Sequence, residues 1–223
     1  MASASVETAG GPLTGALLLA RLAEYGSAAH PYAAGPHLLR GPTASRNLAD
    51  LLHYLCVLHG RYPGLVDHAA ARVTEPEARA WLTQATYAFA GERAYLARLA
   101  VAAGPVPSTP GAAGTDAAVL GQRHAMETLA ASERRGCALG AAMALVLDWA
   151  AIRTCLDAAA DRLGVDPPQY AAADRDAVVA LADSYAAPAA VQRALLFGAE
   201  QILVQHHGLW DLLEARRDAR ATA

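Results

Sequence analysis

Apolar residues recur at intervals of three and four along most of this chain, in long runs separated by clusters of proline and glycine. This spacing is the period of the α-helix, and it gathers apolar side chains on one face of each helix. The alternation of apolar and polar residues that marks a half-buried strand is almost absent. The pattern predicts an all-α protein.

Proline and glycine divide the chain into predicted segments. We expect helices over residues 12–25, 43–73 (interrupted at Pro63 and Gly64), 74–103, 116–164, 174–186 and 188–217. The stretch 26–42 contains too much proline and glycine to hold a helix, and 104–114 is expected to form a stiff crossover. Thr74 is expected to cap its helix, because Pro76 and Glu77 follow it with capping-box spacing.

The segment 116–164 is the most informative one. As one straight helix it would be about 73 Å long, so it must break, and Gly136 is the expected position. The part after Gly136 is apolar on every side, which predicts a central helix surrounded by protein. Gly140 and Ala144 would let another helix approach it closely. The charged residues over 124–135 form either an ionic lock between helices or an active site, and we favour the lock.

These lengths predict a helical bundle with four long helices and additional shorter ones. Together with the long crossover at 104–114, this is the pattern of ferritin-like folds. We expect a single domain over residues 12–217, a flexible N-terminal tail over 1–11 and a C-terminal tail over 218–223. The alternatives are an irregular helical domain, or the ligand domain of a regulator, which would need a basic helix-turn-helix that is not apparent.

Composition excludes several classes of function. The chain has 223 residues, of which 54% are hydrophobic and 17% charged, and a net charge of -3 with mixed signs, so we expect no nucleic-acid partner. All 18 basic residues are arginine. Without lysine there is no Schiff base, no P-loop lysine and no kinase strand lysine.

The three cysteines, Cys56, Cys137 and Cys155, are far apart in apolar segments. This spacing predicts free, buried thiols in a reducing compartment. No signal peptide is apparent, and the uncharged run over 136–147 is too short to span a bilayer. We therefore expect a soluble cytoplasmic protein without a membrane partner.

Six residues are candidate metal ligands: Asp50, His53, Glu92, Glu127, Glu200 and His207. A ferritin-like di-iron centre takes glutamate from two helices and Glu-x-x-His from two others. This chain has no Glu-x-x-His, and offers Asp50 three residues before His53. Glu92, Glu127 and Glu200 fall on apolar stripes, and buried carboxylates need a partner. Iron, manganese or zinc could supply it, but we favour arginines, Arg93, Arg123, Arg134 and Arg135 among them, and expect no cofactor.

A second group, His53, His59, Asp67 and His68, surrounds the interruption at Pro63 and Gly64. His59 and His68 could face each other across it and bind zinc, with Asp67 orienting one imidazole. Histidines at helix ends more often bond free backbone carbonyls, and we favour that role here. His206 and His207 are adjacent, so their rings should point to different faces, one of them toward solvent.

The segments Gly104-Pro-Val-Pro-Ser-Thr-Pro-Gly111 and Ser132-Glu-Arg-Arg-Gly-Cys-Ala-Leu-Gly-Ala-Ala142 resemble an uncharacterised all-α family of high-GC bacteria that is loosely similar to ferritin-like proteins. The similarity covers about residues 43–217. It implies a fold more than an activity.

The function that fits these features is a non-catalytic binding or interaction module with a ferritin-like fold that lacks a complete di-iron site. Its partner would be a second copy, as a homodimer through an alanine-rich helix face, or a small apolar ligand between helices. Signatures such as G-x-S-x-G and H-E-x-x-H are absent. The alternative is a metal-binding redox protein or metalloenzyme that uses the six candidate ligands.

Overall fold

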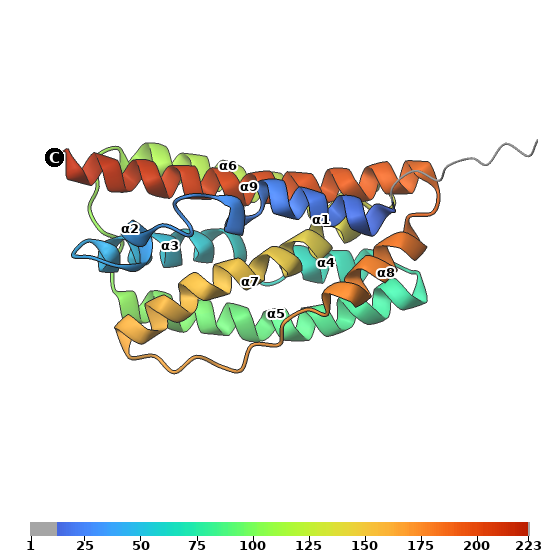
Figure 1. Cartoon of the computed structure of the whole chain (residues 1–223), viewed down its shortest axis with the longest axis horizontal. Helices are drawn as coiled ribbons and strands as arrows, with labels where there is room; N and C mark the ends of the chain where they lie inside the picture. Colours follow the sequence, from blue (N-terminus) through green and yellow to red (C-terminus); the bar gives the residue numbers. More distant parts are fainter. Residues whose placement is uncertain (1–12, 223) are drawn as a thin grey trace, which may run out of the picture.

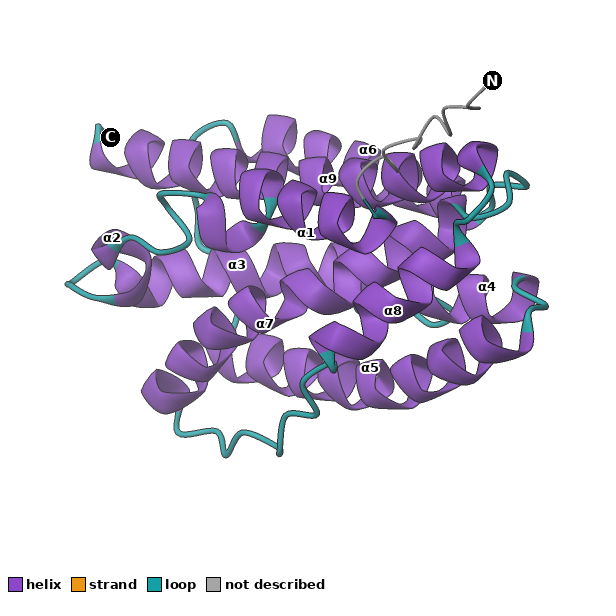
Figure 2. Cartoon of the chain, turned by 45° about the vertical axis from the view of Figure 1, so that its right-hand side comes forward, coloured by secondary structure: helices purple, strands orange, loops and turns teal. Residues whose placement is uncertain are grey.

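A computed structural model describes residues 13–222 of the chain (Figure 1). Within this range the chain forms nine α-helices, one short 3-10 helix (η1) and no strand, which confirms the all-α class (Figure 2). The helices are α1 (Thr14–Tyr25), η1 (Ser27–Ala29), α2 (Pro36–Leu39), α3 (Ala44–His59), α4 (Leu65–Arg72), α5 (Pro76–Ala103), α6 (Ala112–Ala130), α7 (Cys137–Leu163), α8 (Arg175–Tyr185) and α9 (Ala189–Ala221). The tail predicted over residues 1–11 lies outside the described residues.

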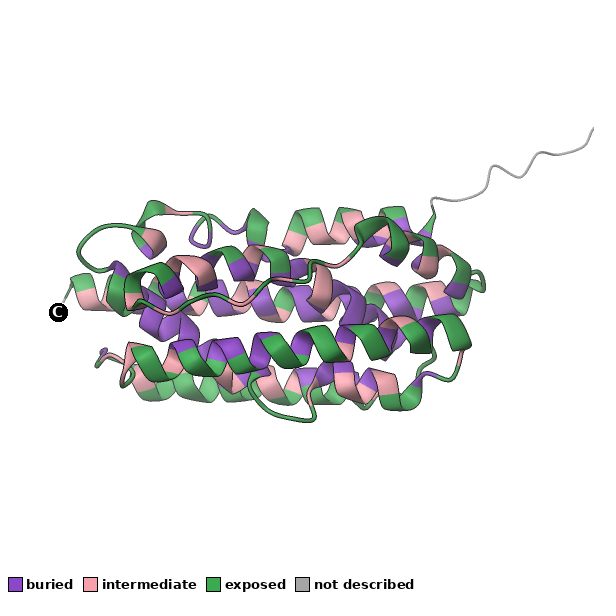
Figure 3. Cartoon of the chain, turned by 90° about the horizontal axis from the view of Figure 1, so that it is seen from below, coloured by how far each residue is buried: buried purple, intermediate pink, exposed green. Residues whose placement is uncertain are grey.

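Helix α7 lies at the centre of the bundle, as its sequence predicts. It packs most extensively against α9 and also contacts α3, α4, α5 and α6. Its first nine residues are all buried, and burial continues on most of the helix (Figure 3). By length and composition α7 could also cross a membrane, but 72% of its most apolar stretch is buried inside the bundle, as in the core helix of a soluble protein.

Two glycines allow α7 and α9 to touch backbone to backbone. A Cβ atom on Gly140 of α7 would lie well inside 3.0 Å of the Leu195 carbonyl oxygen in α9. A Cβ atom on Gly198 of α9 would overlap the Cys137 carbonyl oxygen in the same way. The close approach expected at Gly140 is therefore present, and Gly198 is its counterpart on the facing helix.

Glycine and proline end the helices where the sequence predicts. Gly136 adopts a φ of 97° between α6 and α7, and Gly104 adopts a φ of 76° at the end of α5. Backbone in this left-handed region favours glycine over any residue with a Cβ atom. Pro63 and Gly64 separate α3 from α4, so the long helix expected over 43–73 is two helices.

Three local predictions are wrong. The cap of α5 is Glu75 instead of Thr74, because Pro76 occupies the first helical position. The stretch 26–42 holds the one-turn helix α2, which is anchored by the fully buried Leu38, as well as η1. Helix α9 continues to Ala221 instead of ending near Arg217, because Arg216 and Arg220 bond to residues of α3 and the crossover.

Candidate functional site

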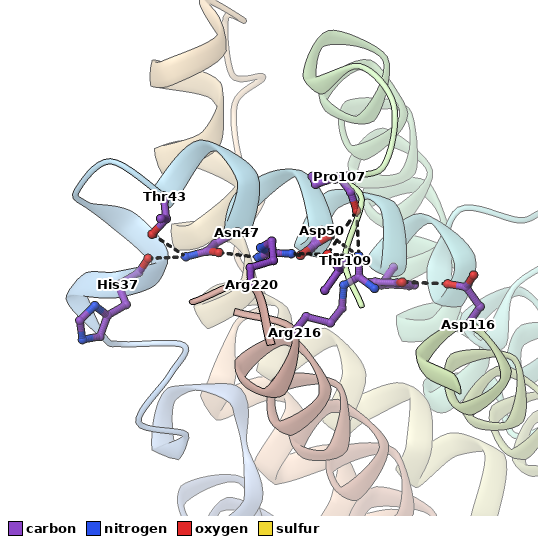
Figure 4. Close-up of polar contacts among 10 residues, drawn as sticks. His37, Thr43, Asn47, Asp50, Pro107, Thr109, Asp116, Arg216 and Arg220 are labelled. Atoms are coloured by element: carbon purple, nitrogen blue, oxygen red, sulfur yellow. Dashed lines mark hydrogen bonds and ion pairs between the residues drawn. The ribbon is translucent and has the colours of Figure 1, made fainter. Parts of the chain in front are cut away.

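Asp50, the first predicted ligand, is held by two arginines at the end of α9. Arg216 Nη2 donates to Asp50 Oδ1 at 2.9 Å, and Arg220 donates to Asp50 Oδ2 (Figure 4). Both guanidinium groups also donate to the Thr109 hydroxyl, at 3.1 and 2.8 Å, and Arg220 donates to Asn47 Oδ1. We call this group the Asp50 clamp. It ties α3, the crossover and α9 together and leaves the Asp50 carboxylate 1% exposed.

Glu92, the second predicted ligand, is also engaged in an ion pair. Arg153 of α7 donates to Glu92 Oε1 at 2.8 Å, and the Trp149 indole donates to Oε2 at 2.9 Å. The side chains of Arg153 and Glu92 are 4% and 8% exposed. Arg153 further donates to Asp157 at 2.6 Å and to the Pro168 carbonyl at 2.7 Å. All three nitrogen atoms of the Arg153 guanidinium group therefore have an acceptor, and the ion pair between Glu92 and Arg153 joins α5 to α7.

The remaining predicted ligands lie in different surroundings. Glu127 is about half exposed beside Arg123, and Glu200 is 37% exposed at 3.2 Å from Arg21. His53 Nε2 lies 2.7 Å from the Gly104 carbonyl, to which it donates. Each of the four predicted carboxylate ligands is thus paired with arginine. Of the arginines that the sequence suggested, only Arg123 is one of these partners. The others are Arg153, Arg216, Arg220 and Arg21.

One trio of metal-binding residue types has its donor atoms within 4.8 Å of one another in the described part of the chain: His30, His207 and Asp211. Of the six predicted ligands it includes only His207, so the structure does not bring those six together. Tyr32 N–H donates to His30 Nδ1 at 3.1 Å, which places the imidazole proton on Nε2. That N–H donates to Asp211 Oδ1, also at 3.1 Å. Since a metal would need the Nε2 lone pair, these hydrogen bonds oppose metal binding.

A chain of buried polar side chains crosses the core beside α7. The backbone N–H and the hydroxyl of Ser27 donate to the Asp148 carboxylate at 2.7 and 2.6 Å, and His206 Nδ1 donates to the same carboxylate at 2.7 Å. His206 Nε2 faces His59 Nε2 at 3.0 Å. One proton must lie between these two nitrogens, because two would repel each other. We call these four residues the histidine chain.

The position of His59 strongly disfavours its charged form. Burial lowers the pKa of His59 well below its usual 6.5, and the nearby His206 and Arg93 lower this pKa further. The rings of Trp149 and Phe89 pack edge-on against the imidazole, with centroids at 5.3 and 6.2 Å. Neutral His59 therefore belongs to the folded state.

We expect acid to destabilise the protein through His59. Since the unfolded chain binds a proton near pH 6.5 and the folded chain does not, stability present above pH 6.5 is lost as the pH falls, by about 1.4 kcal/mol per pH unit for one proton. Urea unfolding of wild type and of His59→Gln between pH 7.5 and 5 measures this loss. The wild type should lose more stability than His59→Gln over this range, and parallel curves would contradict the assignment.

A surface cavity of about 400 Å³ lies where the α3–α4 junction meets α6. Its floor is apolar, with Leu58, Leu65, Met126 and Ala130 all at most 8% exposed. The rim carries the polar residues Arg61, Tyr62, His68, Arg123 and Glu127. This volume lies within the range of small-molecule sites, which combine apolar walls with a few polar groups. We call it the hinge cavity.

The histidines around Pro63 do not come together as the suggested zinc site. His59 faces His206 instead of His68, and His68 lines the cavity. Asp67 accepts a hydrogen bond from Arg93 at 2.7 Å and another from Gly64 N–H at 2.8 Å, so it orients no imidazole.

Several residues of the site escaped the sequence analysis. Asp148 was not among the predicted site residues, although a carboxylate that follows a long apolar run within one helix needs a buried partner. His206 is 1% exposed and His207 is half-buried, so neither ring is fully in solvent as one was expected to be. Ser27 and His30 lie in the proline-rich stretch, where no periodicity marks a residue as buried.

Comparison with known proteins identifies the family. The profile of a family of unknown function (DUF6975) matches residues 22–221, so the chain belongs to this family. The match runs from α1 to the end of α9 and includes the hinge cavity, the histidine chain and the Asp50 clamp. No curated protein and no solved structure matches the chain.

Proposed function

We propose that this member of the DUF6975 family is a non-catalytic binding module that holds a small organic molecule in the hinge cavity. The observation that carries the proposal is the cavity itself, where four buried apolar side chains form a floor beneath a rim of polar groups. An apolar floor supplies affinity by removing ligand surface from water, and a few polar groups fix the orientation of the ligand. A small apolar ligand between helices is one of the two kinds of partner that the sequence suggests.

Binding fits the molecule better than catalysis because its buried acids and bases are already committed. Asp148 and His206 are bonded to each other inside the core, and Asp50 and Glu92 are bonded to arginines. None of these four residues lines the hinge cavity. The groups best suited to acid–base chemistry are therefore used to hold helices together.

The methionines of this chain provide a direct test. There are three: Met126 lines the hinge cavity, Met143 is 0% exposed in α7, and Met1 lies outside the described residues. Protein labelled with 13C at the methionine methyl groups is titrated with the neutral probe N-phenyl-1-naphthylamine and with its sulfonated counterpart, 8-anilinonaphthalene-1-sulfonate. We expect at least one probe to shift the Met126 signal while the Met143 signal stays in place.

The variant Met126→Leu assigns the signal and keeps the cavity apolar. Failure of both probes to shift Met126 would refute the proposed function. A joint shift of Met126 and Met143 would refute it as well, because it would report a general loosening of the core instead of an occupied cavity.

The alternative of a metal-binding redox protein has weaker support. Its best remaining site is the trio of His30, His207 and Asp211, where the hydrogen bonds of His30 oppose coordination. Kinship with ferritin-like bundles likewise stays a prediction, supported by the long helices α5, α7 and α9 and by the crossover before α6.

A further inference from the structure

We infer that the ligand of the hinge cavity is an organic anion, with its apolar body on the cavity floor and its acidic group between Arg61 and Arg123. The inference rests on the proposed function and adds the chemical class of the ligand. Carboxylate and sulfonate groups share the relevant chemistry, since both present oxygens that a guanidinium group binds through two parallel hydrogen bonds.

The charge around the cavity favours an anion. Arg61, Arg123 and His68 face a single acidic residue, Glu127. Glu127 is about half exposed, and its carboxylate is shared between Arg123 at 3.5 Å and His124 at 4.0 Å. Glu127 therefore offsets little of the positive charge on the rim.

The other nearby acid does not offset this charge either. Asp67, on α4, is 6% exposed and forms an ion pair with Arg93 at 2.7 Å. It also accepts the N–H of Gly64. Because Arg93 and Asp67 satisfy each other, the rim keeps two arginines against one glutamate.

Arg123 forms an ion pair with Glu127 but donates no hydrogen bond to any residue between 13 and 222. Its Nε atom is shielded from solvent but forms no hydrogen bond, because the geometry of its contact with Glu127 is poor. Arg61 forms no ion pair with any residue between 13 and 222 and is exposed at the rim. The Arg123 side chain as a whole is 29% exposed and lines the cavity, so its guanidinium group is within reach of a molecule bound there.

A second cavity rich in arginine lies at the start of α7, where Glu75 and Glu133 offset most of the charge of Arg72, Arg134 and Arg135. Arg135 there donates to Glu75 at 2.8 Å, and Arg134 stacks over the Phe197 ring at 5.4 Å. These two guanidinium groups are already occupied by partners within the protein. This contrast selects the hinge cavity as the site for an anion.

The experiment compares two probes that share an aromatic body. We expect 8-anilinonaphthalene-1-sulfonate to bind the full chain roughly tenfold more tightly than neutral N-phenyl-1-naphthylamine, as one charge-assisted hydrogen bond would give. Fluorescence titration at low salt measures both affinities. Arg61→Gln and Arg123→Gln should each weaken sulfonate binding by about tenfold and leave the neutral probe unaffected.

Arg46→Gln is the matched control, since it makes the same change at an exposed position near the start of α3, away from the cavity. It should change neither affinity, and unchanged thermal midpoints verify that the variants fold. Equal affinity for both probes, or sulfonate binding that withstands both rim substitutions, would overturn the anion inference while a shifted Met126 signal still supports the proposed function. If neither probe shifts the Met126 signal, both the anion inference and the proposed function are refuted.

Discussion

Replacing Arg153 with methionine should destabilise the fold by about 3–5 kcal/mol, the usual cost of removing one partner from a buried ion pair. Methionine keeps much of the length of the arginine side chain but none of its charge. Glu92 would then remain inside the bundle with only the Trp149 indole as a hydrogen-bond donor. Urea unfolding measures the loss as a shift of the midpoint at constant slope.

The double variant Glu92→Gln with Arg153→Met separates lost attraction from an unpaired charge. Glutamine still offers an oxygen to Trp149 but no longer carries a charge into the core. Replacing both partners of a buried pair is often close to neutral, so the double variant should recover most of the stability that Arg153→Met loses. If the double variant were as unstable as Arg153→Met, the unpaired Glu92 charge could not be the cause.

The variant Gly140→Ala should cost at least about 3 kcal/mol, the upper end of ordinary overpacking, because backbone must move to make room. The added methyl group would overlap the Leu195 carbonyl oxygen, which belongs to α9 and cannot rotate away as a side chain could. Alanine raises intrinsic helix propensity by about 1 kcal/mol, which offsets only part of this cost. Urea unfolding of the two proteins measures the difference.

Gly121→Ala is the matched control for this prediction. Gly121 also lies inside a helix, α6, but a Cβ atom there would meet nothing within 4 Å. The same substitution should therefore stabilise the protein by up to about 1 kcal/mol. Equal effects at the two positions would contradict the close contact between α7 and α9.

The helices were predictable wherever a local signal ends them. Helix α5 ends at Ala103 as predicted, because Gly104 terminates it, and α7 begins after Gly136. The one-turn helix α2 was missed because tertiary contact through Leu38 stabilises it, and no local pattern records such contact. Thr74 had the right spacing for a cap, yet Glu75 occupies that position and bonds Arg135 of the loop before α7.

The sequence shows which acidic residues need a charged partner, but not which arginines supply it. The apolar stripes predict burial for Glu92, Glu127 and Glu200. Only Glu92 is buried, whereas the side chains of Glu127 and Glu200 are 53% and 37% exposed. Once buried, the charges of Asp50 and Glu92 need a partner. Their partners lie 166 and 61 residues further along the chain. Such distant pairing depends on how the helices pack, which one sequence does not reveal. The hinge cavity escaped prediction for the same reason, since its walls come from two separate segments.

The Asp50 clamp also affects when α3 can reach its native contacts during synthesis of the chain. Asp50 is made 166 residues before Arg216 and 170 residues before Arg220. Before these arginines are made, burial of the Asp50 carboxylate would leave its charge unpaired. The same holds for Asp148 before His206 is made. The native pairing of Asp50 and of Asp148 is therefore completed only when α9 has been made and has docked.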